Sequence, residues 1–145
     1  MTKKELLQYR RSGQELDKQN KLLESYISRL EGLPVYAGTV QSSQKDFPYI
    51  RTHITIDQTD PVLTAHLESM IEAKKQRIQS LLKIREDIED FIKNIDDSTD
   101  RQIFELVFVE GKTHQEAADI MFIERSTVSR RIDRRLKNSH KSHFD

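Results

Sequence analysis

Hydrophobic residues recur at helical spacing over residues 3–31. The apolar stripe consists of Leu16, Leu23, Tyr26, Leu30 and Leu33. A repeat of seven residues with this pattern predicts an amphipathic helix that buries one stripe against a partner. Gly32 and Pro34 predict where that helix stops. Ser12-Gly13 is a weak point within it, because glycine is a poor helix former.

A second helix is predicted from Asp60-Pro61 to about residue 96, with Asp60 as N-cap and Pro61 at the first helical position. Its seven-residue repeat is formed by Leu67, Lys74, Leu81, Ile88 and Ile95. Each long helix has a single apolar stripe and therefore needs a partner. The simplest arrangement is a long antiparallel, coiled-coil-like helical hairpin within residues 1–97. Pairing across a homodimer is the alternative, and the pattern does not separate the two.

Residues 32–60 interrupt the helical pattern. Segments 35–40 and 49–56 are rich in β-branched residues, and a polar, turn-like stretch over 41–46 separates them. We expect a small β-like or irregular insert here, either a hairpin or an ordered loop. A two-stranded hairpin is marginal alone, so the flanking helices are its expected support.

The C-terminal block shows closely spaced local signals. Ser98 is the expected cap of a helix to about residue 110, and Gly111 suits a left-handed position after it. Thr113 and Glu116 form a capping box that opens a short helix. A tight turn over 121–123 precedes a last helix at about 124–138, with apolar positions at Val128, Ile132 and Leu136. A short helix, a turn and a basic helix predict a helix-turn-helix domain over 98–138, and 139–145 is expected to be a flexible tail.

Packing through these apolar positions leaves the opposite face of the last helix free. At 100° per residue that face carries Ser126, Thr127, Arg130, Arg134 and Lys137. A helix in this position can lie in the DNA major groove, with its N-terminal half against the base edges.

Composition supports extended helices with a basic end. The 145 residues include 24 Lys+Arg and 24 Asp+Glu, for a formal net charge of +0, and hydrophobic residues make up 35%. Residues 123–145 nevertheless carry seven basic and three acidic side chains. Zero cysteines exclude disulfides and cysteine chemistry. The apolar runs are too short for a membrane span, and no signal peptide is evident, so we expect a cytoplasmic protein with no membrane partner.

Two stretches of the C-terminal block also carry a family resemblance. They are 110–118 (Glu-Gly-Lys-Thr-His-Gln-Glu-Ala-Ala) and 126–132 (Ser-Thr-Val-Ser-Arg-Arg-Ile). They resemble the region 4 helix-turn-helix of sigma-70-type factors, and the small phage and prophage transcription regulators that use this domain. The resemblance covers roughly residues 98–138, and the preceding long helices and linker are similar to the layout of such phage regulators.

The resemblance implies particular DNA contacts. Base-edge contacts are implied for Arg125, Ser126, Thr127, Ser129 and Arg130. Phosphate contacts are implied for Arg131, Arg134, Lys137 and the helix start around Thr113. Three residues depart from the family's pattern. Glu124 stands at an N-cap where the family favours Ser or Thr, Phe122 occupies a turn position that often has Gly or Asn, and Asp133 weakens the basic stripe.

We therefore expect an all-α, non-enzymatic protein without cofactor or metal that binds double-stranded DNA specifically and regulates transcription, of phage or prophage genes by resemblance. His140 and His143 have the spacing of a pair of metal ligands but stand alone in the expected tail, so we expect no metal site there. The acidic residues over 86–90 are distributed around the solvated outer face of a helix, so we do not expect them to act as general acid and base. RNA polymerase is a partner by resemblance only, and the long helices are a homodimer candidate. The alternative is a structural or oligomerisation protein of a phage, such as a small terminase-like packaging subunit, with secondary DNA binding.

Overall fold

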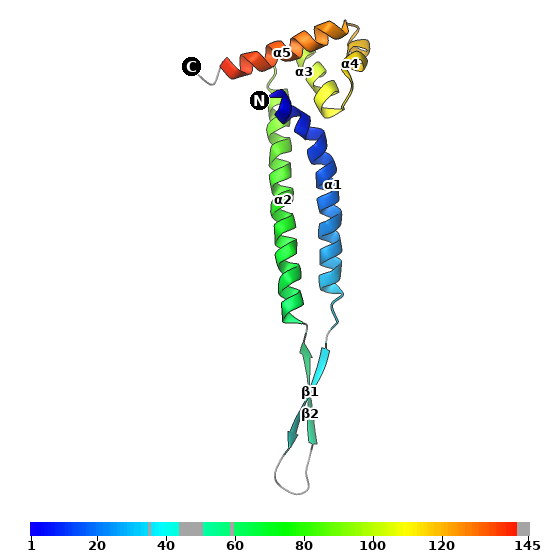
Figure 1. Cartoon of the computed structure of the whole chain (residues 1–145), viewed down its shortest axis with the longest axis vertical. Coiled ribbons are helices and arrows are strands. Elements are labelled where there is room, and N and C mark those ends of the chain that lie inside the picture. The colour runs from blue at the N-terminus through cyan, green and yellow to red at the C-terminus, as the bar shows by residue number, and fades with distance from the viewer. Residues whose placement is uncertain (35, 44–50, 59, 142–145) are drawn as a thin grey trace. The chain divides into compact units, whose positions relative to one another are not determined.

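The computed structural model describes the backbone of residues 1–34, 36–43, 51–58 and 60–141, and side chains in 1–34 and 60–139. Helices dominate the described chain, as the sequence predicts (Figure 1). The elements in chain order are α1 (Lys3–Glu31), β1 (Tyr36–Ser43), β2 (Arg51–Gln58), α2 (Pro61–Lys93), α3 (Ser98–Phe104), the π-helical turn η1 (Glu105–Val109), α4 (His114–Met121) and α5 (Arg125–Lys141). No helix in the described part of the chain is both long and apolar enough to span a bilayer.

The ends of the two long helices follow from local chemistry. Asp60 caps α2, because its Oδ1 accepts hydrogen bonds from the amides of Val62 (3.0 Å) and Leu63 (3.3 Å). Gly32 follows the end of α1 and donates its N–H to the Ser28 carbonyl (2.9 Å). The bounds of α1 confirm the prediction, whereas α2 ends at Lys93 rather than near residue 96.

The segment between the long helices contains an antiparallel pair of strands. β1 and β2 pair from Tyr36 opposite Gln58 to Ser43 opposite Arg51. This is the hairpin alternative of the sequence prediction. The polar stretch predicted as its turn lies partly at 44–50, outside the described residues.

The chain divides into two compact units, residues 1–18 with 77–145 and residues 19–76. In the second unit, Leu67 and Ile71 are buried, and the predicted stripe of α1 is only half-buried there. The helix-turn-helix segment belongs to the first unit, together with the start of α1 and the end of α2.

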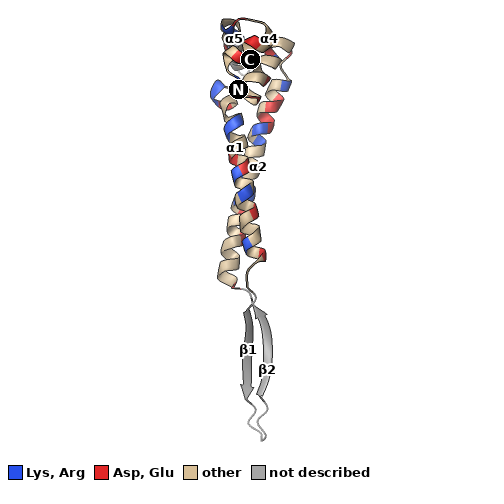
Figure 2. Ribbon diagram, turned by 90° about the vertical axis from the view of Figure 1, so that its right-hand side faces the viewer, with Lys and Arg blue, Asp and Glu red and all other residues tan. Residues whose placement is uncertain are grey.

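Within the first unit, the start of α1 lies beside the C-terminal half of α2 (Figure 1, Figure 2). Arg85 joins them: its guanidinium lies 4.0 Å from the centre of the Tyr9 ring and donates to the Tyr9 carbonyl (2.8 Å). Arg77 and Glu15 form a bidentate ion pair with N–O distances of 2.7 and 2.9 Å. The long helices thus pair within one chain, and basic and acidic residues alternate along both of them (Figure 2).

The pairing of α1 with α2 explains why residue 13 is a glycine. A Cβ at Gly13 would come within 2.7 Å of the Arg85 guanidinium, so the missing side chain makes room for the arginine. Ser12 is buried and bonds the Tyr9 carbonyl through Oγ (2.6 Å). The predicted weak point is therefore a continuous stretch of α1 that packs closely on α2.

One hydrophobic core joins the base of the helical hairpin to the C-terminal helices. Its members are Leu6, Tyr9, Ile88, Ile92, Ile95, Ile103, Phe104, Phe108, Ala117, Ala118, Val128, Ile132 and Leu136. The rings of Phe104 and Phe108 pack at a centroid distance of 5.3 Å, with Phe91 beside Phe104 at 6.0 Å. Since these residues come from α1, α2 and the C-terminal helices alike, the hairpin base and the helix-turn-helix segment share their packing.

Three details of the C-terminal block differ from the sequence prediction. The N-cap of α3 is Asp97, not Ser98, because the Asp97 carboxylate accepts from the Asp100 amide (2.9 Å). The predicted helix to residue 110 ends instead in η1. α5 continues through Lys141, so the helix includes part of the expected tail, and residues 142–145 lie outside the described chain.

Candidate nucleic-acid interface

The start of α4 has the capping box that the sequence predicts. Thr113 Oγ1 accepts from the Glu116 amide (3.2 Å), and the Thr113 amide donates to Glu116 Oε2 (2.8 Å). The bond from the Thr113 backbone also holds the pKa of Glu116 below its ordinary value. The first turn of α4 therefore carries a carboxylate beside Thr113, where a phosphate contact is implied by resemblance.

The turn between α4 and α5 is tight and left-handed. Phe122 has φ 56° and ψ 43°, and Ile123 donates its N–H to the Ala118 carbonyl (3.0 Å). Left-handed backbone is costly for a residue with a Cβ. The side chain of Phe122 is 95% exposed, so burial does not offset this cost. Ala117 and Ala118 are fully buried in the shared core.

α5 is seated as the apolar pattern predicts. Val128, Ile132 and Leu136 are buried in the shared core, and Ile123 packs partly buried against it. Because these residues hold one side of α5, the opposite side is left at the surface. On that side Ser126, Arg130, Arg134 and Lys137 are exposed, and Thr127 is half-buried.

Arg131 lies on the flank of α5 that faces α3. Its Nη1 is 2.8 Å from Asp100 Oδ1 and 3.6 Å from Asp97 Oδ1. Asp100 is 3% exposed, and its hydrogen bond raises the pKa of the Arg131 guanidinium. Arg134 also approaches Asp100, at 3.8 Å, but its side chain stays 62% exposed. Arg131 thus has a structural partner, and its implied phosphate contact stays a prediction.

The opposite flank of α5 is tied to α4. His114 Nδ1 lies 2.8 Å from Ser129 Oγ, so the residue implied as a base contact is already hydrogen-bonded within the domain. The pKa of His114 is lowered, first by burial and then by the positive charges of Lys3 and Arg125, while Asp133 raises it. Arg125 is exposed at the start of α5, near the ring that joins the two helices.

The structure brings the predicted residues together on three sides of α5. The outer face holds Ser126, Thr127 and Arg130 of the predicted base contacts, together with the cations Arg134 and Lys137. Arg131 and Ser129 instead hold the helix in place from its flanks. The sequence prediction did not identify Asp100 as the partner of Arg131, or His114 as the partner of Ser129. Periodicity gives no signal for either pair, because both pairs depend on how separate helices cross.

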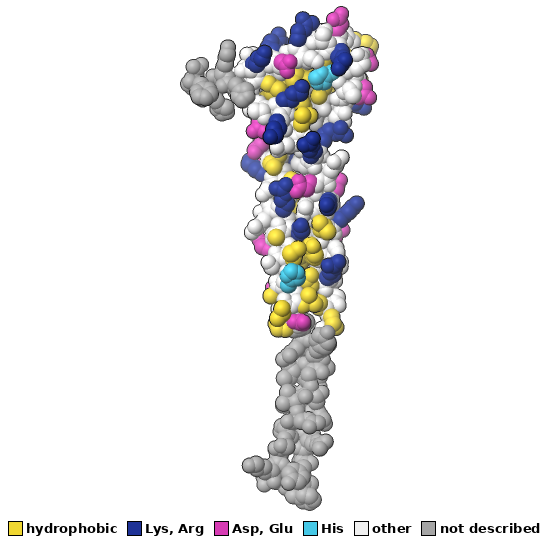
Figure 3. All heavy atoms as spheres, in the orientation of Figure 1, with side chains coloured by type: hydrophobic (Ala, Val, Ile, Leu, Met, Phe, Trp, Pro, Cys, Tyr) yellow, Lys and Arg dark blue, Asp and Glu magenta, His cyan; other side chains and the backbone are white. Residues whose placement is uncertain are grey.

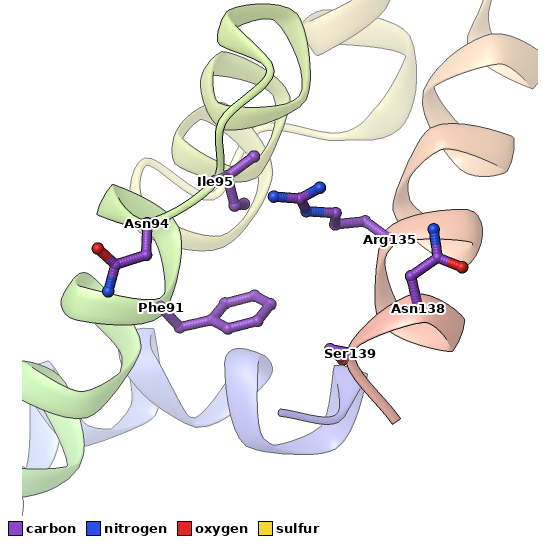
Figure 4. A pocket seen from close by; sticks show the side chains of 6 residues that line it. All are labelled: Phe91, Asn94, Ile95, Arg135, Asn138 and Ser139. Carbon is purple, nitrogen blue, oxygen red and sulfur yellow. The ribbon is translucent and has the colours of Figure 1, made fainter. Parts of the chain in front are cut away.

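A shallow pocket lies beside α5, away from the predicted contacts. It has a volume of about 320 Å³ and lies between the end of α2 and the C-terminal half of α5 (Figure 4). Phe91 extends into it from α2, and Arg135 reaches in from α5 toward Ile95 (Figure 4). Among the described residues, His, Asp and Glu form no cluster that could hold a metal ion.

Comparison with known families agrees with this geometry. Residues 97–138 match the family model described as sigma-70, region 4. No curated protein and no solved structure shows a significant match to the chain. The matched segment covers less than a third of the chain and coincides with α3, η1, α4 and nearly all of α5. Residues 97–138 are therefore a helix-turn-helix DNA-binding domain of the sigma-70 region 4 type, joined to a long helical hairpin.

Proposed function

We propose that the protein is a sequence-specific regulator of transcription, acting on phage or prophage genes, that reads the major groove with α5. The observation that carries this proposal is the outer face of α5 within the matched domain, where Ser126 and Arg130 stand exposed near the N-terminal end. The assignment to phage or prophage genes rests on the resemblance of the chain's layout. The protein acts as a binding module without catalysis.

The mechanism combines base readout with phosphate neutralisation. Arg pairs bidentately with guanine, and Ser or Thr can bond several bases, so Arg125, Ser126, Thr127 and Arg130 supply specificity. Arg134 and Lys137 lie further along the same helix and supply affinity through the DNA backbone. With about four phosphate contacts per module, log affinity falls with log salt at a slope of about −3.6, and about twice that for a dimer.

The test is binding to random DNA and to fragments of the source genome over a salt series. We expect selected fragments to bind far more tightly than random DNA. Arg130→Ala should then relax base preference, whereas Arg134→Ala should weaken all sequences alike and make the salt slope shallower by about 0.9. Absence of DNA binding at low salt would refute the proposal and leave the basic face as solvated surface.

Two partners belong to the same proposal. RNA polymerase is the protein partner that the sigma-70 region 4 type suggests, and co-purification of the polymerase with the full chain at a promoter fragment tests it. Mass measurement in solution tests the homodimer. A monomer or dimer supports regulation, whereas a ring of higher order would favour the alternative of a packaging protein.

A further inference from the structure

The first turns of α1 pack on the DNA-binding domain, although they lie far outside the segment that matches the family. Leu6 is fully buried, and Tyr9 is buried beside it, in the core that also holds Val128 and Ile132 of α5. Because this side of α1 is buried, the orientation of the adjacent polar face of the helix is fixed. The polar residues of these turns therefore have defined positions relative to α4 and α5.

Arg10 lies against the loop that leads into α4. Gly111 has φ +74°, and a Cβ built there would overlap the guanidinium of Arg10. Glycine at position 111 therefore both permits the left-handed backbone and leaves room for the arginine side chain. Since Gly111 stands two residues before the cap at Thr113, a cation from α1 lies beside the start of α4.

Lys3 extends the same positive region. Lys3 stands seven residues before Arg10, which is about two helical turns, so the two side chains lie on the same face of α1. The positive charges of Lys3 and Arg125 also lower the pKa of His114 in the first turn of α4. In the part of the chain that the structure describes, neither Lys3 nor Arg10 forms a salt bridge, and both are exposed. On the face seen in Figure 3, Lys and Arg side chains spread from the helix-turn-helix end on to the start of α1.

The positive charges of Lys3 and Arg10 lie near the negative charge that the capping box places at the start of α4. The Glu116 carboxylate lies at the first turn of α4 and opposes an approaching phosphate, although helix N-termini otherwise favour anions. Cations beside this turn offset that repulsion. Lys3 and Arg10 are placed to do so, and long flexible side chains of this kind can reach a backbone at the edge of the groove.

We propose that Lys3 and Arg10 contact the DNA phosphate backbone beside the start of α4, so that the first helix widens the DNA footprint beyond the sigma-like domain. The inference rests on the proposed function, since it requires DNA on the outer face of α5. It assigns a DNA-binding role to residues that lie almost the whole chain length away from α5 in sequence.

The test uses the full chain and a duplex of random sequence over a salt series. The variant Lys3→Gln/Arg10→Gln removes two cations, and Lys18→Gln/Lys21→Gln removes two exposed cations further along α1 as a matched control. If each lost cation removes one phosphate contact, the slope becomes shallower by about 1.8, and affinity at about 0.1 M salt falls roughly 60-fold. The control should keep the wild-type slope.

A slope for Lys3→Gln/Arg10→Gln equal to that of the control overturns the inference. If Arg134→Ala still makes the slope shallower, only the role of α1 fails and the proposed function stands. If wild type shows no salt-dependent binding, both fail. Should the double variant unfold, Lys3→Gln alone is expected to lose about 0.9 of slope and Arg10→Lys to keep the wild-type slope. Any other result for these two contradicts the inference.

Discussion

The ion pair between Asp100 and Arg131 is expected to hold α5 on α3. Replacing Asp100 by Asn keeps the size of the side chain but removes the charge that faces Arg131 at 2.8 Å. The Asp100 side chain is 5% exposed and that of Arg131 is 30% exposed. The substitution therefore leaves a half-buried guanidinium without its main counter-charge.

The magnitude follows from distance and exposure. At 2.8 Å and an effective dielectric constant of about 20, the attraction is about 6 kcal/mol before desolvation is subtracted. Breaking a fully buried pair typically costs about 3–5 kcal/mol. Arg131 keeps part of its contact with water, and Asp97 remains at 3.6 Å, so we expect a loss of about 2 kcal/mol.

Urea denaturation checks this loss. With a typical dependence of about 2 kcal/mol per molar urea, the midpoint for Asp100→Asn should fall by roughly 1 M. Asp96→Asn, an exposed neighbour, is the matched control and should stay within about 0.5 kcal/mol of wild type. Equal midpoints for the two variants would refute the reasoning. Arg131→Ala separates the two roles of this residue: the phosphate contact implied by the resemblance would make the salt slope of DNA binding shallower by about 0.9, whereas a purely structural role would leave the slope unchanged.

Two further predictions concern the turn and the junction of α4 and α5. Phe122→Gly should stabilise the protein by up to about 1 kcal/mol in urea denaturation, because glycine removes the left-handed strain at φ 56° and little burial is lost; destabilisation would mean that Phe122 contributes packing. The pKa of His114 is lowered from 6.5 in the folded state, so the unfolded chain binds the proton more readily, and stability should fall as the pH drops through about 6.5 toward the folded pKa. The urea midpoint of wild type should therefore be lower at about pH 5.5 than at about pH 7.5, and this difference should be smaller in His114→Asn. An equal difference in the two proteins would contradict the role assigned to His114.

Local signals in the sequence predict much of this fold. Proline and aspartate at 60–61 fix the start of α2, and the capping box of Thr113 and Glu116 is present as expected. Gly111 has the predicted positive φ. These features are decided by atoms within a few residues of one another, so a single sequence carries them.

Features that depend on how distant segments meet were not predictable in the same way. Leu6 and Tyr9 lie before the apolar repeat of α1, yet they are buried in the core of the C-terminal helices. The pairing of Arg131 with Asp100 depends on how α5 crosses α3. Even the cap of α3 was misplaced by one residue, because Asp97 and Ser98 are both good caps and the turn after α2 decides between them.

The shared core limits the modularity of the DNA-binding segment. An excised 97–138 fragment would expose the surfaces of Phe104 and Phe108 that belong to a core including Leu6, Ile88 and Ile92. A chimera that keeps the reading helix intact must therefore also carry the first turns of α1 and the end of α2. By the same connection, the base of the hairpin and the underside of α5 share their packing, so a substitution that disturbs one should also disturb the other.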